Sequence, residues 1–318
     1  MREKTNQYDI IGDVHGRWDK LEPLLTKLGY QHNGQCHAHR EGRIALFLGD
    51  LIDPKGNSPN GTREVLHAVK SMCDAEQAQC ILGNHEYNLV AYHTPDQQGG
   101  FLRPHSEKNG RMHAGTHAAF EEHHNELSEI WLPWFKTLPF YLDLSELRLV
   151  HACWHPEYVS ILKGKTLGDD ALLRESVVKD SPAYEAIETV LKGVEAPMPQ
   201  GHYFHDNQGN KRTEFRVRWW DKEATSPTVR NMVFPKDESF PDTPMCQEDV
   251  DALIGYSHSE KPVFIGHYYK PADSPMEMES PNLCCADFSA ANGGPLVAYR
   301  WNSTKPLSPE HLITHTTD

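Results

Sequence analysis

Long apolar runs are missing from this sequence, and none of its apolar stretches approaches the roughly 20 residues that span a bilayer. The first ten residues, MREKTNQYDI, lack the apolar core of a secretory signal peptide. The seven cysteines form no CxxC pair, which argues against a zinc knuckle and against an ordinary disulfide framework. These absences predict a protein with no membrane partner that works in a reducing compartment, and we expect the cytoplasm.

Positive charge is also scarce relative to negative charge. Lysine and arginine number 31 against 45 aspartate and glutamate residues, which gives a net charge of −14. Such an acidic chain repels nucleic acid in general, so we expect no nucleic-acid partner. The hydrophobic share of 38% is nevertheless that of a folded chain, and 318 residues are ample for a sizeable core.

The first ninety residues carry an alternating pattern of strands and helices. Three apolar runs, Tyr8–Ile11, Arg43–Leu48 and Gln79–Leu82, each stop at a glycine and predict buried strands. Apolar residues at helical spacing between these runs predict two helices, the first of which ends at Gly29. The order β-α-β-α-β is typical of a parallel sheet, whose ligand crevice lies outside the carboxyl ends of the strands.

The second half of the chain is less regular. A hairpin is predicted over 140–151, and a further strand over 263–265. Residues 155–260 lie between these two elements, and we interpret them as an insertion or a cap over the site. Two last apolar runs, 282–288 and 295–301, predict a closing hairpin. We therefore expect one catalytic domain over residues 1–318.

Polar side chains follow the predicted strands with the types and spacing of metal ligands. Asp13 and His15 are two residues apart, so in extended backbone both project to the same side. Asp50 can bridge two ions through its two oxygens, and further oxygen and nitrogen ligands come from Asn84, His151 and His267. Such a mixed set suits manganese, iron, zinc, cobalt or nickel. Two of these divalent ions can clamp the attacking and leaving oxygens of a phosphoryl transfer and activate a shared water.

Each of these residues has an ordinary structural alternative when it is taken singly. Asp13 alone would be a turn residue or a helix cap, and Asn84 alone a turn residue. His151 alone would be a histidine whose hydrogen bonds are satisfied within its strand. Only the ordered set favours a metal centre.

Five motifs in one order resemble the metallophosphoesterase superfamily, most closely its phosphoprotein phosphatase branch and the related bis(5′-nucleosyl)-tetraphosphatases. The resemblance implies an α/β fold in which two mixed sheets form a sandwich flanked by helices, α-β-β-α. The motifs are GDVHG at 12–16, GDLID at 49–53, GNHE at 83–86, a histidine at 151 and GH at 266–267.

By this resemblance, two divalent ions are the cofactors, with manganese as the first choice. One ion would be held by Asp13, His15 and Asp50, and the other by Asp50, Asn84, His151 and His267. The resemblance also implies that His85 is the general acid that protonates the leaving oxygen, with Asp53 orienting its ring.

One element of the family pattern is absent. The phosphatase branch reads GD-x-x-D-R-G, and its arginine grips the substrate phosphate, whereas this chain continues from Asp53 with Pro-Lys-Gly. Lys55 therefore lies one position late and offers a single charge in place of a bidentate fork. Arg103, Arg216 and Arg218 are the other candidate phosphate ligands. We expect an arginine, with Arg103 first, to carry this role ahead of Lys55.

The leading hypothesis from the sequence is a phosphatase that acts on phosphoserine, phosphothreonine or phosphotyrosine in proteins. The alternative is hydrolysis of dinucleoside polyphosphates on the same metal core, so the expected partner is a phosphorylated protein or a small phosphoester. A nuclease of the superfamily is disfavoured because the final motif reads GHYY, without the second histidine of GHxH. An inactive interaction module is disfavoured because every matched ligand is present.

Overall fold

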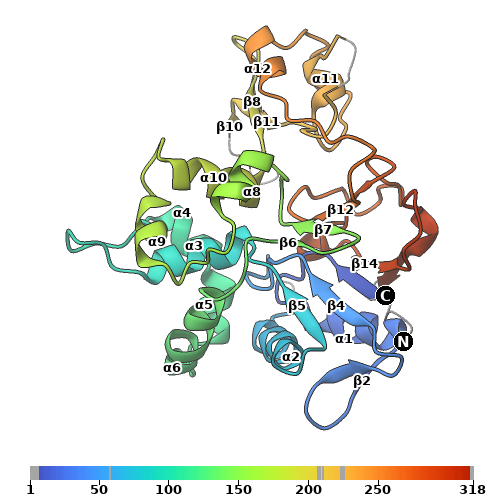
Figure 1. The fold of residues 1–318 in the computed structure, drawn as a ribbon. Coiled ribbons are helices and arrows are strands. Elements are labelled where there is room, and N and C mark those ends of the chain that lie inside the picture. The colour runs from blue at the N-terminus through green and yellow to red at the C-terminus, as the bar shows by residue number, and fades with distance from the viewer. Residues whose placement is uncertain (1–6, 57–58, 206–208, 210, 223–225, 316–318) are drawn as a thin grey trace.

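Two sheets packed face to face form the centre of the molecule. The computed structural model describes residues 7–56, 59–205, 209, 211–222 and 226–315. The first sheet has the strand order β15-β14-β1-β4-β5, and the second has the order β13-β12-β7-β6 (Figure 1). The strands of the first sheet are β1 (Tyr8–Ile11), β4 (Ile44–Phe47), β5 (Ala78–Cys80), β14 (Leu296–Trp301) and β15 (Leu312–His315). Those of the second are β6 (Tyr141–Asp143), β7 (Arg148–Val150), β12 (Val263–Ile265) and β13 (Leu283–Cys285).

The parallel core predicted from the sequence is present in the first sheet. β1, β4 and β5 run parallel, with Ile10 opposite Leu46, while β14 and β15 add antiparallel strands at the β1 side. Alternate residues of these strands face opposite ways. Ile10 and Leu46 therefore pack between the two sheets, while Ile11 and Phe47 pack against the helices on the outer face.

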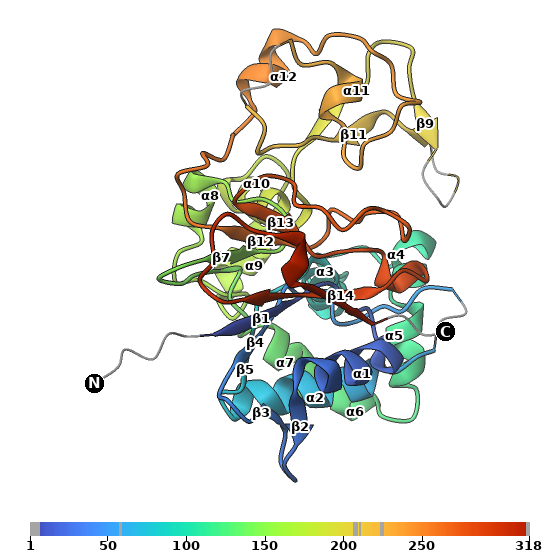
Figure 2. The ribbon, with the colours of Figure 1, turned by 90° about the vertical axis from the view of Figure 1, so that its right-hand side faces the viewer.

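Helices cover the outer faces and complete the expected α-β-β-α sandwich. α1 and α2 pack against the first sheet (Figure 2), and α1 ends at Gly29, whose left-handed conformation caps it, as the sequence predicts. A small hairpin that the sequence analysis missed, β2 (Tyr30–His32) with β3 (His37–His39), follows α1. The bounds of the helices up to residue 192 are α1 (Trp18–Leu28), α2 (Thr62–Asp74), α3 (Asn84–His93), α4 (Glu107–Met112), α5 (Ala114–Ala119), α6 (His124–Glu126), the π-helix η1 (Leu127–Trp131), α7 (Leu132–Phe135), α8 (Pro156–Ile161), α9 (Asp170–Glu175) and α10 (Pro182–Lys192).

The closing hairpin expected over 282–301 is wrong. β13 pairs in parallel with β12 in the second sheet, whereas β14 pairs antiparallel with β1 in the first. The connection between them, which includes the 3-10 helix η2 (Ala290–Asn292), passes from one sheet to the other. Both strands are almost fully buried. A position within one of two packed sheets buries a strand more completely than a terminal hairpin would. The 3-10 helix η3 (Pro309–His311) then leads into β15.

The irregular region 155–260 divides into two parts. Its first part, α8 to α10, packs into the main core, whereas the described residues between 195 and 253 form a lobe at the top of Figure 1 with a hydrophobic cluster of its own. The lobe contains β8 (Glu195–Pro197), β9 (Phe204–His205), β10 (Lys211–Arg212), β11 (Glu214–Arg216), α11 (Val229–Met232) and α12 (Gln247–Asp251). Over the described ranges, no helix has both the length and the apolar character needed to cross a membrane.

Candidate metal centre

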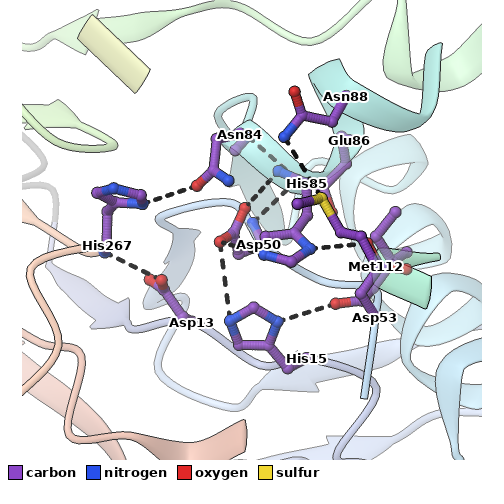
Figure 3. A network of polar contacts seen from close by, with 12 residues as sticks. Asp13, His15, Asp50, Asp53, Asn84, His85, Glu86, Asn88, Met112 and His267 are labelled. Atoms are coloured by element: carbon purple, nitrogen blue, oxygen red, sulfur yellow. Dashed lines mark hydrogen bonds and ion pairs between the residues drawn. The ribbon is translucent and has the colours of Figure 1, made fainter. Parts of the chain in front are cut away.

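Five turns bring six polar side chains together at one end of the two sheets. The turns follow the carboxyl ends of β1, β4, β5, β7 and β12, where a parallel sheet places its ligands. Figure 3 shows side chains from four of these turns pointing toward one another. The six residues are the predicted metal ligands Asp13, His15, Asp50, Asn84, His151 and His267.

Asp50 lies between two clusters of ligand atoms. Ligand atoms of Asp50, His151 and His267 lie within 4.8 Å of one another, and so do those of His15, Asp50 and His85. The Oδ1 atom of Asp50 is 3.4 Å from Nε2 of His151, and its Oδ2 atom is 3.7 Å from Nε2 of His15. The two carboxylate oxygens therefore face different histidines, as a residue shared by two ions would require.

Asn84 and Asp13 complete the donor set. The side-chain oxygen of Asn84 lies 3.0 Å from Nε2 of His151 and 2.7 Å from Nδ1 of His267. Oδ2 of Asp13 accepts a hydrogen bond of 3.0 Å from the backbone N–H of His267. Its Oδ1 is buried and has no hydrogen-bond partner in the described part of the chain. A buried carboxylate oxygen without a donor is costly unless a cation balances it, so this oxygen fits a metal ligand.

Backbone hydrogen bonds fix the orientation of two of the imidazoles. Nδ1 of His15 donates to the carbonyl of Ile52 at 3.0 Å, and Nδ1 of His151 donates to the carbonyl of Leu48 at 2.6 Å. These bonds direct each Nε2 toward the centre, where an imidazole that has lost its Nε2 proton can bind a metal.

The turns themselves adopt strained backbone conformations. His15, Asp50 and His267 have positive φ angles of 48°, 48° and 54°, which side chains other than glycine rarely adopt. Such strain persists where the surrounding structure holds the residue in place, and it is concentrated at functional sites. Gly266 adds a spatial constraint, because a Cβ atom at this position would collide with the carboxylate of Asp13.

Glu86 supports the turns, although the sequence analysis gave it no role within the GNHE motif. Its buried carboxylate accepts backbone hydrogen bonds from Asp50 at 2.9 Å, Leu51 at 2.8 Å and Gly83 at 3.1 Å. It therefore joins the turn after β4 to the turn after β5. A glutamate in the first helical turn after a strand is the signal that could have identified it.

Excess negative charge is buried at the centre. Burial raises the pKa of Asp13 well above its usual range, and the nearby charges of Asp287 and Asp50 raise it further. Asp287 is also buried, and the sequence analysis did not single it out. Burial also lowers the pKa of His267 well below its usual range, with Arg216 adding to the effect. Burial likewise lowers the pKa of His15, to about 3, whereas the charges of Asp50 and Asp13 outweigh burial and raise that of His151 to about 10. Crowded carboxylates beside imidazoles that can bind as neutral ligands suit divalent cations, which the donor set therefore fits.

His85 and Asp53 form the expected pair. Nδ1 of His85 donates to Oδ2 of Asp53 at 2.7 Å, while its Nε2 faces the centre, 3.9 Å from Oδ2 of Asp50. Burial opposes protonation of this imidazole, but the charges of Asp50 and Asp53 outweigh burial and raise the pKa of His85. The sequence analysis missed two further partners of Asp53, namely His113 at 2.8 Å and the Thr116 hydroxyl at 2.5 Å.

The four candidate phosphate ligands occupy different environments. Arg216 donates to the carbonyl of His267 at 2.8 Å and lies 3.0 Å from its Nε2, so it reaches the metal centre from the lobe. Arg218 instead pairs with Asp221 at 3.3 Å inside the lobe. Arg218 also lies beyond the end of β11, so the alternation of Arg216 and Arg218 in the sequence does not place them on one strand face.

Lys55 and Arg103 complete the candidate set. Burial is the largest influence on the pKa of His15 and of His85, and the charge of Lys55 also contributes to both. Lys55 therefore lies close enough to act on the centre. Arg103 is not seen in contact with a predicted metal ligand in the described chain: its backbone N–H donates to the carbonyl of Ala91, and its guanidinium lies 3.9 Å from the sulfur of Met112.

Comparison with known proteins gives one family and several relatives. Residues 8–273 match the family of calcineurin-like phosphoesterases. A stretch of 86 residues is 42% identical to the bis(5′-nucleosyl)-tetraphosphatase PrpE of Halalkalibacterium halodurans, covering 27% of this chain and 33% of that protein. The protein of the same name from Bacillus subtilis is 31% identical over 151 residues, 46% of this chain and 57% of the relative. The match thus spans between a third and somewhat over half of the length of these relatives.

Among solved structures, a protein serine/threonine phosphatase from Saccharomyces cerevisiae has a similar fold. The two share 12% sequence identity with a TM-score of 0.50 over 98% of this chain and 79% of the other. At this identity, the similarity extends to the fold alone.

Proposed function

This chain belongs to the calcineurin-like phosphoesterases, and from that premise we propose that it is a two-metal hydrolase that cleaves dinucleoside polyphosphates. The family makes it a metallophosphoesterase, so the number of ions and the substrate are the parts that we propose. The observation that carries the two-metal assignment is the place of Asp50, which belongs to both clusters of ligand atoms.

We assign the ligands as the motifs imply, with Asp13, His15 and Asp50 at one ion and the remaining residues sharing Asp50 at the other. Divalent ions at these positions would polarise the phosphoryl oxygens and lower the pKa of bound water. Manganese is our first choice, with iron, zinc, cobalt or nickel as alternatives. Metal analysis of the purified protein should find two ions per chain.

Two groups of this chain would act on the substrate directly. His85 presents Nε2 to the centre and is held by Asp53, an arrangement that supports a role as the acid that protonates the leaving oxygen. Arg216 supplies positive charge at His267, Lys55 supplies positive charge that acts on His15, and both would hold the phosphoryl group. The position of Arg216 also supports a role for residues 155–260 as a cap.

The substrate class rests on the relatives. Both matched proteins are named bis(5′-nucleosyl)-tetraphosphatases, which supports a dinucleoside polyphosphate over the phosphoprotein that the sequence analysis placed first. The metal core serves either substrate, because both reactions need the same charge stabilisation at phosphorus.

The test is a substrate panel measured with the purified protein and added Mn²⁺. The panel contains diadenosine tetraphosphate, a phosphoserine peptide, a phosphotyrosine peptide and p-nitrophenyl phosphate. We expect the highest kcat/KM on diadenosine tetraphosphate and loss of all activity on chelation with EDTA. A phosphopeptide with a tenfold higher kcat/KM would replace the dinucleotide as the substrate, and activity that withstands chelation would contradict the metal assignment.

A further inference from the structure

A cavity of about 230 Å³ lies beside the helix that carries Asn84 and His85. Tyr87 and Asn88 of α3 line one side of it, and Arg103 and Lys192 line others. Residues three and four positions after Asn84 share its helix face. At a rise of 1.5 Å per residue, Asn88 lies about 6 Å along the axis from Asn84. The lining of the cavity therefore begins about one helical turn from Asn84, and none of the six predicted ligands is part of it.

The polar groups of this cavity are poorly satisfied by the protein. Asn88 is 2% exposed, and its unpartnered Oδ1 in the described ranges is an acceptor, so the donors available to an anion are its Nδ2 and the Arg103 guanidinium. Nδ2 of Asn88 donates to the sulfur of Met112 at 3.8 Å, and a guanidinium nitrogen of Arg103 donates to the same sulfur at 3.9 Å. The Nε atom of Arg103 is buried and also lacks a partner there. A thioether is a weak acceptor, so these donors lack the strong partner that buried polar groups normally have.

The charge of the cavity is positive. Glu188 forms an ion pair with Lys192 one turn away on α10, so these two charges offset each other. The described chain gives Arg103 no ion pair, and Glu188, whose charge also acts on Arg103, is already paired with Lys192, so two positive charges face one negative charge here. A planar fork of donors in a half-buried setting matches the oxygens of a phosphate better than a solvated surface charge would.

We propose that this cavity is a second oxyanion site, which holds a phosphate of the substrate one or two positions away from the phosphate at the metal centre. The assignment rests on the proposed function and extends it, because it predicts a preference for substrates with several linked phosphates over monoesters. The cavity is smaller than the roughly 300 Å³ at which sites for whole organic ligands begin. It therefore suits a phosphate group and not a complete nucleoside.

The test compares two substrates in two variants. Arg103→Gln removes the charge and keeps most of the side-chain length, and Arg103→Lys keeps the charge without the fork. Arg111→Gln is the matched control, because Arg111 is an exposed arginine on α4 whose side chain pairs with the exposed Glu107. For each protein, kcat/KM is measured on diadenosine tetraphosphate and on p-nitrophenyl phosphate with Mn²⁺.

In Arg103→Gln we expect the ratio of kcat/KM for the tetraphosphate to that for the monoester to fall at least tenfold, with a smaller fall in Arg103→Lys. The control should keep the wild-type ratio, and all variants should keep the wild-type melting temperature. An unchanged ratio in Arg103→Gln would overturn the proposal. An equal fall on both substrates would also overturn it, because it would place Arg103 at the reacting phosphate or in a structural role.

Direct binding separates this proposal from the proposed function. Tripolyphosphate is titrated into the protein, and Arg103→Gln should bind it at least tenfold more weakly than wild type. If wild type hydrolyses the monoester but not diadenosine tetraphosphate, the proposed function fails, and this titration still decides the cavity. If inorganic phosphate alone changes monoester turnover through Arg103 and tripolyphosphate binds no tighter, the cavity is an effector site for free phosphate and the substrate assignment is overturned.

Discussion

His85 and His113 donate hydrogen bonds to the same oxygen of Asp53, at 2.7 and 2.8 Å. The other oxygen of this carboxylate accepts from Thr116. Burial opposes ionisation, yet the hydrogen bonds from His113 and His85 outweigh burial and hold the pKa of Asp53 below its usual range. Asp53 is thus a fixed negative charge behind His85. Thr116 of α5 and His113, the residue before that helix, hold that charge in place.

The first prediction concerns the pH dependence of catalysis. Because Asp50 and Asp53 raise the pKa of His85, its acid form persists to higher pH than that of a free imidazole. Replacing Asp53 by Asn removes one of these charges, so the pKa of His85 should fall. The alkaline limb of the kcat profile should therefore move to lower pH. A limb that stays in place would show that another group titrates there.

Acid catalysis by His85 gives the second prediction. His85→Asn should lower kcat on substrates with poor leaving groups by roughly 10²- to 10⁴-fold, the usual contribution of a general acid. Nitrophenolate leaves without a proton, so p-nitrophenyl phosphate should lose much less. Equal losses on phosphoserine peptide and p-nitrophenyl phosphate would instead assign His85 to the metal site, where its Nε2 clusters with His15 and Asp50.

The third prediction concerns the shared ligand. Asp50→Asn should reduce turnover by several orders of magnitude, because one neutral oxygen and one amide nitrogen cannot bridge two cations. Metal content, measured by elemental analysis, should fall with it. Asp251→Asn, at an exposed position on α12, is the control and should retain both. Retention of both metal and activity in Asp50→Asn would exclude a two-metal centre that is bridged by Asp50.

A matched pair of arginines provides the fourth prediction. Arg216→Ala should lower kcat/KM, with a loss of transition-state stabilisation of ~1.5–3 kcal/mol, the value of a charged hydrogen bond. The reason is that Arg216 contacts His267. Arg218→Ala should change kcat/KM by less than about threefold, because Arg218 is engaged with Asp221 in the lobe. The two substituted arginines are only two residues apart. Unequal losses of kcat/KM would therefore reflect the different contacts of the two side chains and not general damage to the lobe. Equal losses would contradict the assignment.

Lys55 is the subject of the last prediction. The sequence favours an arginine over Lys55 as the phosphate ligand. Burial is the largest influence on the pKa of His15, His85 and Asp287, and the charge of Lys55 contributes to each of these pKa values. Lys55→Ala should therefore raise KM or lower kcat/KM on the same substrate, by a factor that corresponds to a loss of ~1.5–3 kcal/mol. Lys55→Arg should retain most of the activity. A silent Lys55→Ala variant would leave Arg216 as the main phosphate ligand.

The sequence by itself determined the local elements and the order of the motifs. Short apolar runs that stop at glycine predict β1, β4 and β12, and helical spacing predicts α1 up to Gly29. These signals are local, because hydrophobic periodicity and turn residues act within a few positions. Since parallel strands point their carboxyl ends the same way, the sequence also predicts that the three turns with Asp13 and His15, Asp50 and Asn84 converge, whereas His151 and His267 join the set through the family motifs.

The tertiary structure alone decided which distant groups complete the site. His113 contacts Asp53 and Arg216 contacts His267, across 60 and 51 positions, and the charge of Asp287 acts on Asp13 across 274 positions. The same holds for the separation of β13 and β14 onto two sheets. No periodicity encodes such pairs, because they depend on how sheets, helices and the lobe pack against one another. That packing is set by burial summed over the whole chain, and only the folded structure displays its result.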